Sequence, residues 1–122
     1  WMVARIDEMS ARVRADFVVL DPAFPLGLVG PSLRLPYDVI LHGAEVTVPG
    51  RLPGPRQLLG HVLRGAVQIV AAGGYPAAEA ARAAGRPLPT TIVPPGVDTD
   101  RFRPLSVAER HAALRPRRDM RE

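Results

Sequence analysis

Short apolar runs and longer amphipathic segments alternate along this sequence. Runs of strand length, rich in Val, Ile, Leu or Thr, occupy four places: Phe17–Leu20, Asp38–Leu41, Val67–Ala71 and Thr90–Val93. Continuous apolar runs of this kind are typical of strands that are covered on both faces. The segments between them repeat apolar residues every three or four positions, which is the spacing of an amphipathic helix. The pattern therefore predicts strands that alternate with helices.

The predicted helices are Met2–Ala15, Leu26–Leu35, Pro55–Ala66, Tyr75–Ala84 and Val107–Leu114. The second is the weakest, because glycines and a proline interrupt it. Gly85 suits the left-handed residue that ends a helix, and Ser106 suits an N-cap. The alternation favours an α/β fold, with a parallel sheet of about four strands and helices on both faces. Such a set is expected of the second half of a Rossmann-like domain rather than of a complete one.

Size and composition limit the class of protein. The chain has 122 residues, of which 47% are hydrophobic, so it forms one domain or part of one. It contains no Cys, which excludes disulfides and thiolate metal sites. No apolar run approaches the roughly 18 residues of a membrane-spanning helix, and early charged residues argue against a signal peptide. Trp1, in place of an initiator Met, suggests that the sequence begins inside a longer reading frame.

The formal net charge is +4. The sequence contains 16 Arg and no Lys. Abundant Arg, Ala and Pro are typical of a GC-rich genome, which explains this usage without a functional role. The alternative is a surface that binds phosphate, because a guanidinium donates two parallel hydrogen bonds to it. Part of the charge lies in the tail, Arg110–Arg121. Basic residues are not interleaved with aromatic ones, which argues against nucleic-acid binding.

The segment Tyr37–Thr47 is the strongest candidate for a functional site. Its apolar run ends in His42 and Gly43, at the place where a parallel sheet presents ligand-binding residues. We interpret His42 as a donor to a substrate hydroxyl or to a developing charge; the alternative is that it only ties the loop to a backbone carbonyl. Three roles remain open for Glu45: orienting His42, holding a sugar hydroxyl, or capping the backbone that follows.

Other chemical signals are weaker. His42 and Glu45 alone are too few ligands for a metal ion, so we predict no metal site. Gly73–Gly74 follows a strand and suits a phosphate at a helix start, but it lacks the spacing of a dinucleotide fingerprint. His61 and His111 are expected at the surface. Arg82 and Arg86 are expected to be solvated.

Two stretches resemble one enzyme family. They are Tyr37–Glu45 and Val93–Pro104, the latter with the sequence V-P-P-G-V-D-T-D-R-F-R-P. Both are similar to segments of the retaining, family-four glycosyltransferases of the GT-B fold, and in particular to those of actinobacterial phosphatidylinositol mannosyltransferase-type enzymes. The second stretch is the more specific, and it resembles the family's crossover between two domains. The resemblance covers roughly residues 1–110.

In this family two Rossmann-like domains face each other across a cleft, the N-terminal one holding the acceptor and the C-terminal one holding the sugar nucleotide. The resemblance implies that His42 is catalytic and that Gly43 and Glu45 bind substrate. It also implies an interdomain loop of four residues: Pro95, Gly96, Val97 and Asp98.

The resemblance divides the chain into three parts. Residues 1–93 would be the second half of the acceptor-side domain, 94–104 the crossover loop, and 105–122 the start of the C-terminal domain or a truncated tail. The stretch Leu114–Glu122 no longer resembles the family. Neither the family's opening glycine-rich strand and loop nor its donor-binding domain is in the sequence. We therefore expect this chain alone to be inactive.

The implied reaction transfers a sugar, with mannose from GDP-mannose expected, to a lipid or glycan acceptor. It uses no cofactor besides the donor substrate. The resemblance implies a cytoplasmic location, and it leaves peripheral contact with the inner face of the plasma membrane open. Two other hypotheses remain. One is a non-catalytic α/β module, or gene remnant, that binds a sugar or partner through its exposed sheet edge. The other is a different α/β enzyme with His42 as general base.

Overall fold

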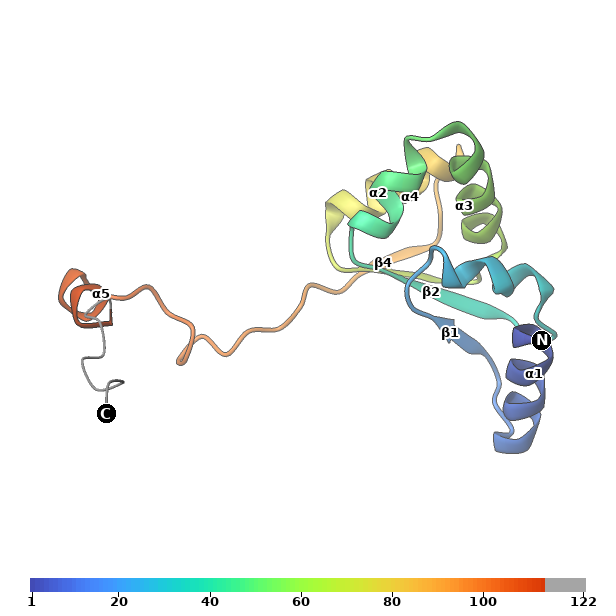
Figure 1. The fold of residues 1–122 in the computed structure, drawn as a ribbon, viewed down its shortest axis with the longest axis horizontal. Helices are drawn as coiled ribbons and strands as arrows, with labels where there is room; N and C mark the ends of the chain where they lie inside the picture. The colour runs from blue at the N-terminus through green and yellow to red at the C-terminus, as the bar shows by residue number, and fades with distance from the viewer. Residues whose placement is uncertain (114–122) are drawn as a thin grey trace, which may run out of the picture.

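The computed structural model describes residues 1–113 and has an α/β fold (Figure 1). Its strands are β1 (Val18–Leu20), β2 (Tyr37–Leu41), β3 (Ile69–Ala71) and β4 (Thr90–Ile92). They form a sheet in the order β1-β2-β3-β4, in which every neighbouring pair is parallel. The predicted fold class, a four-stranded parallel sheet of the Rossmann-like half-domain type, is confirmed.

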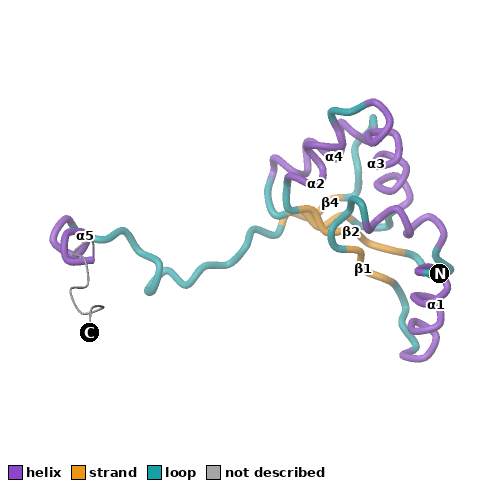
Figure 2. Tube along the Cα trace, viewed as in Figure 1, coloured by secondary structure: helices purple, strands orange, loops and turns teal. Residues whose placement is uncertain are grey.

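The helices are α1 (Met2–Val13), the 3-10 helix η1 (Leu26–Ser32), α2 (Ala44–Gly50), α3 (Pro53–Gly65), α4 (Gly74–Ala84) and α5 (Val107–Ala113). η1 joins β1 to β2, α2 and α3 join β2 to β3, and α4 joins β3 to β4 (Figure 2). Gly85 ends α4 with a φ of 71°, and the N–H of Glu109 donates to the Ser106 hydroxyl over 3.3 Å. Both predicted helix ends are therefore confirmed.

Two helical segments differ from the prediction. The segment predicted as a helix at Leu26–Leu35 is a shorter 3-10 helix, because its glycines serve close packing instead of α-helix formation. A Cβ at Gly30 would lie 2.7 Å from Cε2 of Tyr37. The helix α2 was not predicted, since a glycine precedes it and Pro49 lies inside it.

One face of the sheet packs against η1, α2, α3 and α4. β2 buries three side chains at the alternate spacing of a strand: Tyr37, Val39 and Leu41. Opposite them, α3 contributes three fully buried residues: Leu59, Val62 and Leu63. The Tyr37 hydroxyl donates to the Val62 carbonyl over 2.7 Å, and burial raises the pKa of Tyr37. Each such apolar side chain contributes about 1.5–3 kcal/mol when buried, so this face supplies most of the stability.

The opposite face of the sheet is open. We predicted helices on both faces, and among the described residues this is wrong. The reason is topological: strand order follows chain order, so crossovers of the usual right-handed kind place every connecting helix on the same side. On the open face Val19 is 49% exposed, while Ile40 and Val70 are half-buried.

Beyond β4 the chain leaves the sheet. The N–H of Val93 donates to the Ala71 carbonyl over 2.8 Å, and the chain then runs extended to α5, which lies apart from the sheet (Figure 1). The predicted domain boundaries, at residues 93–94 and 104–105, stay predictions. Leu114, the predicted end of the last helix, and the tail to Glu122 lie outside the described residues.

Candidate functional site

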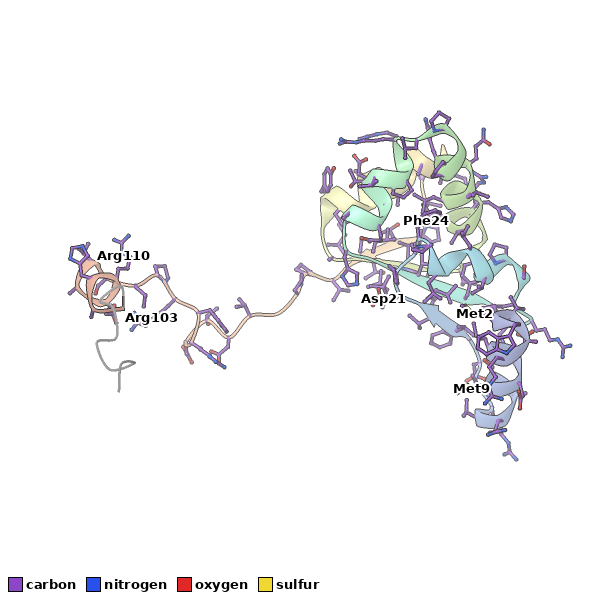
Figure 3. All side chains as sticks on the ribbon, viewed as in Figure 1. Met2, Met9, Asp21, Phe24, Arg103 and Arg110 are labelled. Carbon is purple, nitrogen blue, oxygen red and sulfur yellow. The ribbon has the colours of Figure 1, made fainter. Side chains whose placement is uncertain are left out.

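The carboxyl ends of β1 and β2 lie side by side, and a titratable residue follows each strand. Asp21 follows β1 and His42 follows β2. Nε2 of His42 lies 2.9 Å from Oδ1 of Asp21, and the two side chains are 59% and 47% exposed. Figure 3 labels Asp21 beside these strand ends. His42 therefore lies at the carboxyl edge with a carboxylate partner, while its catalytic role stays a prediction.

Glu45 caps the start of α2. Its Oε1 accepts a hydrogen bond from the backbone N–H of His42 at 2.5 Å, and both of its carboxylate oxygens accept from the N–H of Gly43 at 3.0 Å. A carboxylate in the first turn also complements the positive end of the helix. These N–H groups precede Glu45 in the chain, so its carboxylate holds the turn that carries His42 and does not cap the backbone that follows, as the third open role had it. Its predicted contact with substrate stays a prediction.

Gly43 allows the sharp turn between β2 and α2. Its φ of 152° lies in the region that favours glycine, and an added Cβ would meet no atom within 4 Å. The space beside this backbone is therefore open, as close approach of a ligand requires. Whether Gly43 binds substrate stays a prediction.

A second polar pair lies next to the turn. Oγ1 of Thr47 donates to the Gly43 carbonyl over 2.9 Å, and it lies 3.3 Å from the hydroxyl oxygen of Tyr75. Thr47 comes from α2 and Tyr75 from the first turn of α4, which follows β3. Tyr75 is 56% exposed. The ends of three adjacent strands thus contribute polar groups to one corner.

The corner offers both hydrogen-bond donors and acceptors. A neutral imidazole that donates its Nε2 hydrogen to Asp21 keeps Nδ1 as an acceptor, and a protonated imidazole donates from both nitrogens. The Tyr75 hydroxyl adds a group that both donates and accepts. These groups suit the recognition of a hydroxyl-rich or anionic ligand.

Sequence reasoning missed Asp21, Thr47 and Tyr75. Asp21 lies between a predicted strand and a predicted helix, and Tyr75 is the first residue of a predicted helix, so neither was singled out for chemistry. A signal was available for Asp21, because it stands in the same relation to β1 as His42 does to β2. Carboxyl ends of adjacent parallel strands meet at one edge, so both side chains belong to it.

The other predicted site residues lie elsewhere. Pro95, Gly96 and Val97 are exposed in the extended segment after β4. Asp98 closes a turn there, since its Oδ1 accepts from the N–H groups of Asp100 and Arg101, each over 3.0 Å. Their role as an interdomain loop stays a prediction. The glycines at 73 and 74 lie at the start of α4, and their phosphate role also stays a prediction.

His61 and His111 are exposed, as predicted. Arg82 is solvated, as predicted, with its side chain 62% exposed, and it also pairs with the buried carboxylate of Glu79 over 2.7 Å. A carboxylate that is 5% exposed needs such a partner. Arg86 is exposed, and its Nη2 donates to a backbone carbonyl of α3.

Residues 1–113 contain no group of three or more His, Cys, Asp or Glu side chains that could hold a metal ion. In the same residues, no helix has the length and apolar character needed to cross a membrane. No protein-family model matches this chain, and no curated protein matches it either.

Proposed function

We propose that this chain is the acceptor-side half-domain of a retaining GT-B glycosyltransferase, which transfers a sugar from a sugar nucleotide to a lipid or glycan acceptor. Mannose from GDP-mannose is the first donor to test. The observation that carries the proposal is the corner after β2. There His42 is paired with Asp21, and Glu45 holds the turn through two backbone N–H groups.

The proposed work of the corner is positioning and charge stabilisation. Sugar transfer from a nucleotide develops negative charge on the leaving diphosphate, and donors fixed in advance stabilise it. His42 supplies such a donor, or orients a sugar hydroxyl, from a rigid strand end. Gly43 leaves room for a ligand beside the backbone. Fixed geometry of this kind also lowers the entropic cost of bringing the reactants together.

The test uses the complete reading frame that contains this sequence. Sugar transfer from GDP-mannose and other sugar nucleotides to membrane-lipid and glycan acceptors is measured for the parent and for His42→Ala. We expect kcat/KM to fall by about 100-fold or more, because general acid–base and electrostatic groups typically contribute that much. The 122-residue chain alone is expected to give no transfer.

His61→Ala is the matched control, since His61 is also an exposed histidine but lies on α3. We expect it to retain the parental kcat/KM. Unfolding midpoints of both variants separate a lost catalytic group from a lost fold. Parental activity in the His42→Ala variant would overturn the assigned role, and transfer by the isolated chain would overturn the half-domain assignment.

A non-catalytic binding module is the second candidate. The observation that favours it is the open face of the sheet, where Val19 is half exposed and the outer edge of β1 has no strand partner among the described residues. Such an edge invites pairing with another chain. A glycine-rich strand upstream and a paired-glutamate domain downstream in the reading frame would favour the enzyme, and stop codons on both sides would favour the module.

A further inference from the structure

A groove rich in arginine lies between α3 and α4, near the end of α4. It has a volume of about 400 Å³ and is lined by six residues, which we call the arginine groove: Arg51, Pro53, Arg56, Gln57, Arg64 and Ala83. Three of the six are cationic and none is acidic. α4 begins at the carboxyl edge of the sheet and extends for about 15 Å, so the groove is separate from the His42 corner.

Two of the guanidinium groups are held in place by α4. Nη2 of Arg56 donates to the Arg82 carbonyl and Nη1 of Arg64 donates to the Ala84 carbonyl, each over 3.0 Å. These carbonyls are in the last turn of the helix, where partners are lacking and the dipole favours cations. Each guanidinium has five donors and uses one in these contacts. The remaining N–H groups are therefore oriented in advance for another acceptor.

Gly60 sets the spacing of this arrangement. A Cβ at Gly60 would lie 2.7 Å from the Ala83 carbonyl oxygen and 2.9 Å from Nη1 of Arg64. Glycine thus allows α3 to touch the end of α4 and allows Arg64 to pass over the contact. Arg56 and Arg64 are each four residues from Gly60, so all three share one face of α3.

The positive charge of the groove is not balanced locally. Arg51 is exposed and makes no side-chain hydrogen bond or ion pair with any other residue of the described range. Glu79, on α4, is buried and already bound by Arg82. Arg86 adds a further cation beside the groove, with Nη2 donating to the Arg64 carbonyl over 3.2 Å. Capping of α4 accounts for Arg56 and Arg64, but it leaves Arg51 without a structural role.

We infer that the arginine groove binds a phosphate group, carried by a free diphosphate or by the headgroup of an anionic lipid. Guanidinium forks match the oxygens of phosphate, and several forks around one hollow favour a multiply charged anion. The groove walls offer the guanidinium donors of three arginines and the amide donor of Gln57, and these donors suit a polar, anionic ligand. This inference does not depend on the proposed sugar transfer.

The test is a titration of the full 122-residue chain with pyrophosphate at low ionic strength, followed through the Arg Nε–H signals in ¹H–¹⁵N NMR spectra. We expect saturable shifts of the groove arginines. Arg51→Gln should weaken binding by about tenfold, because a charge-assisted hydrogen bond is lost. The Arg51 side chain is exposed and makes no hydrogen bond or ion pair among residues 1–113, so this variant tests binding rather than stability.

Arg110→Gln on α5 is the matched control, because it removes the same charge from an exposed position outside the groove. A second arm measures flotation with vesicles of phosphatidylcholine alone and of phosphatidylcholine mixed with phosphatidylglycerol. Pyrophosphate binding that only Arg51→Gln weakens supports a free phosphate. Vesicle binding that requires phosphatidylglycerol, and that only Arg51→Gln weakens, supports a lipid headgroup. Binding to neither probe, or equal weakening by both variants, would overturn the inference.

Discussion

The sheet with its covering helices and the segment around α5 are held together by different forces. Behind β2, fully buried residues such as Val39 and Leu63 exclude water, and the hydrogen bonds there are mostly backbone ladders. Around α5 every residue from Val93 to Leu105 is exposed, and order comes from contacts between charged and polar groups. Apolar burial does not change with pH, whereas carboxylate contacts do.

The His42 corner combines both kinds of support. Its polar side chains are about half exposed, but β1, β2 and β3, which deliver them, end in the apolar core. Substitutions should therefore affect stability strongly in the core, moderately in the corner and only locally at α5.

The largest effect is expected in the core. Leu63→Ala should lower the free energy of unfolding by about 2–5 kcal/mol, because it removes a fully buried side chain and leaves a cavity. Urea denaturation followed by circular dichroism measures the loss. Leu58→Ala is the matched control, since Leu58 lies on the same helix and is 51% exposed; its cost should stay below about 1 kcal/mol. Equal losses in the two variants would contradict the assigned core.

A smaller effect is expected from overfilling the contact between η1 and the sheet. In Gly30→Ala the new Cβ would meet the Tyr37 ring at 2.7 Å and Cδ1 of Leu20 at 2.9 Å. We expect a loss of about 1–3 kcal/mol. Gly74→Ala is the control, because a Cβ there meets no atom within 4 Å, and it should stabilise the chain by about 0.4–1 kcal/mol. If Gly30→Ala leaves the free energy of unfolding unchanged, then η1 moves freely away from β2.

These two sites also show where sequence patterns succeed and fail. The limits of β2 were predicted to within one residue, because a buried strand has a strong local signature. η1 was not recognised as a 3-10 helix, since its glycines are explained by contacts with Tyr37 and Val62, which are distant in sequence. Non-local packing of this kind is invisible to local periodicity.

The candidate site was predictable to a similar degree. His42 was found because it ends an apolar run, but its partner Asp21 is 21 residues away in the sequence. Neighbouring strands, not local spacing, bring the two together. α2 was missed because a glycine precedes it and Pro49 lies inside it, while the Glu45 carboxylate that holds its start bonds to the N–H groups of His42 and Gly43.

Glu45→Ala should therefore have an intermediate effect. It removes the acceptor for the N–H groups of His42 and Gly43, which should cost about 0.5–2 kcal/mol, the usual range for a helix cap. The His42 ring should also become less ordered in this variant. The line widths of its NMR signals detect that change. Glu8→Ala on α1 is the control, because Glu8 makes only exposed ion pairs, worth about 0–1 kcal/mol. Unchanged stability and sharp His42 signals would show that the turn holds without its cap.

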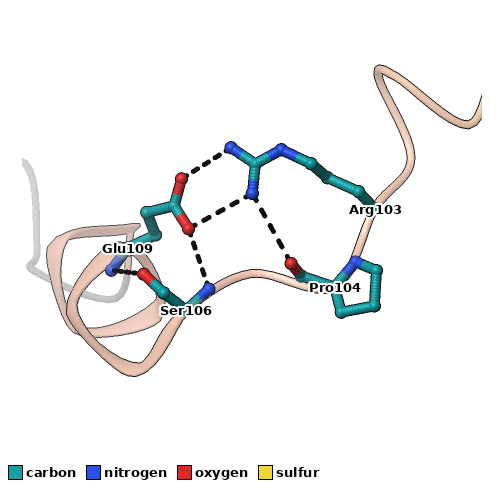
Figure 4. Close-up of polar contacts among 4 residues, drawn as sticks. All are labelled: Arg103, Pro104, Ser106 and Glu109. Atoms are coloured by element: carbon teal, nitrogen blue, oxygen red, sulfur yellow. Dashed lines mark hydrogen bonds and ion pairs between the residues drawn. The ribbon is translucent and has the colours of Figure 1, made fainter.

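The smallest effect is expected at α5, where it should depend on pH. Glu109 accepts from Arg103 over 2.6 Å and from the N–H of Ser106 over 2.8 Å, while Ser106 caps the helix in return (Figure 4). This is a capping box closed by a guanidinium. The contact with Arg103, followed by those with Ser106, lowers the pKa of Glu109 from 4.5 to about 2.

A lowered pKa means that the carboxylate form is the one that supports the helix. The support should be complete above pH 4.5 and should disappear as the pH falls toward 2. Carbon chemical shifts of the Glu109 carboxyl and of the Val107–Ala113 backbone should report both changes together, while the sheet signals of β2 stay constant. Glu109→Gln should show low α5 helicity at every pH in this range. If α5 instead loses helicity only when the sheet unfolds, then it depends on the core, and local charge is not what orders it.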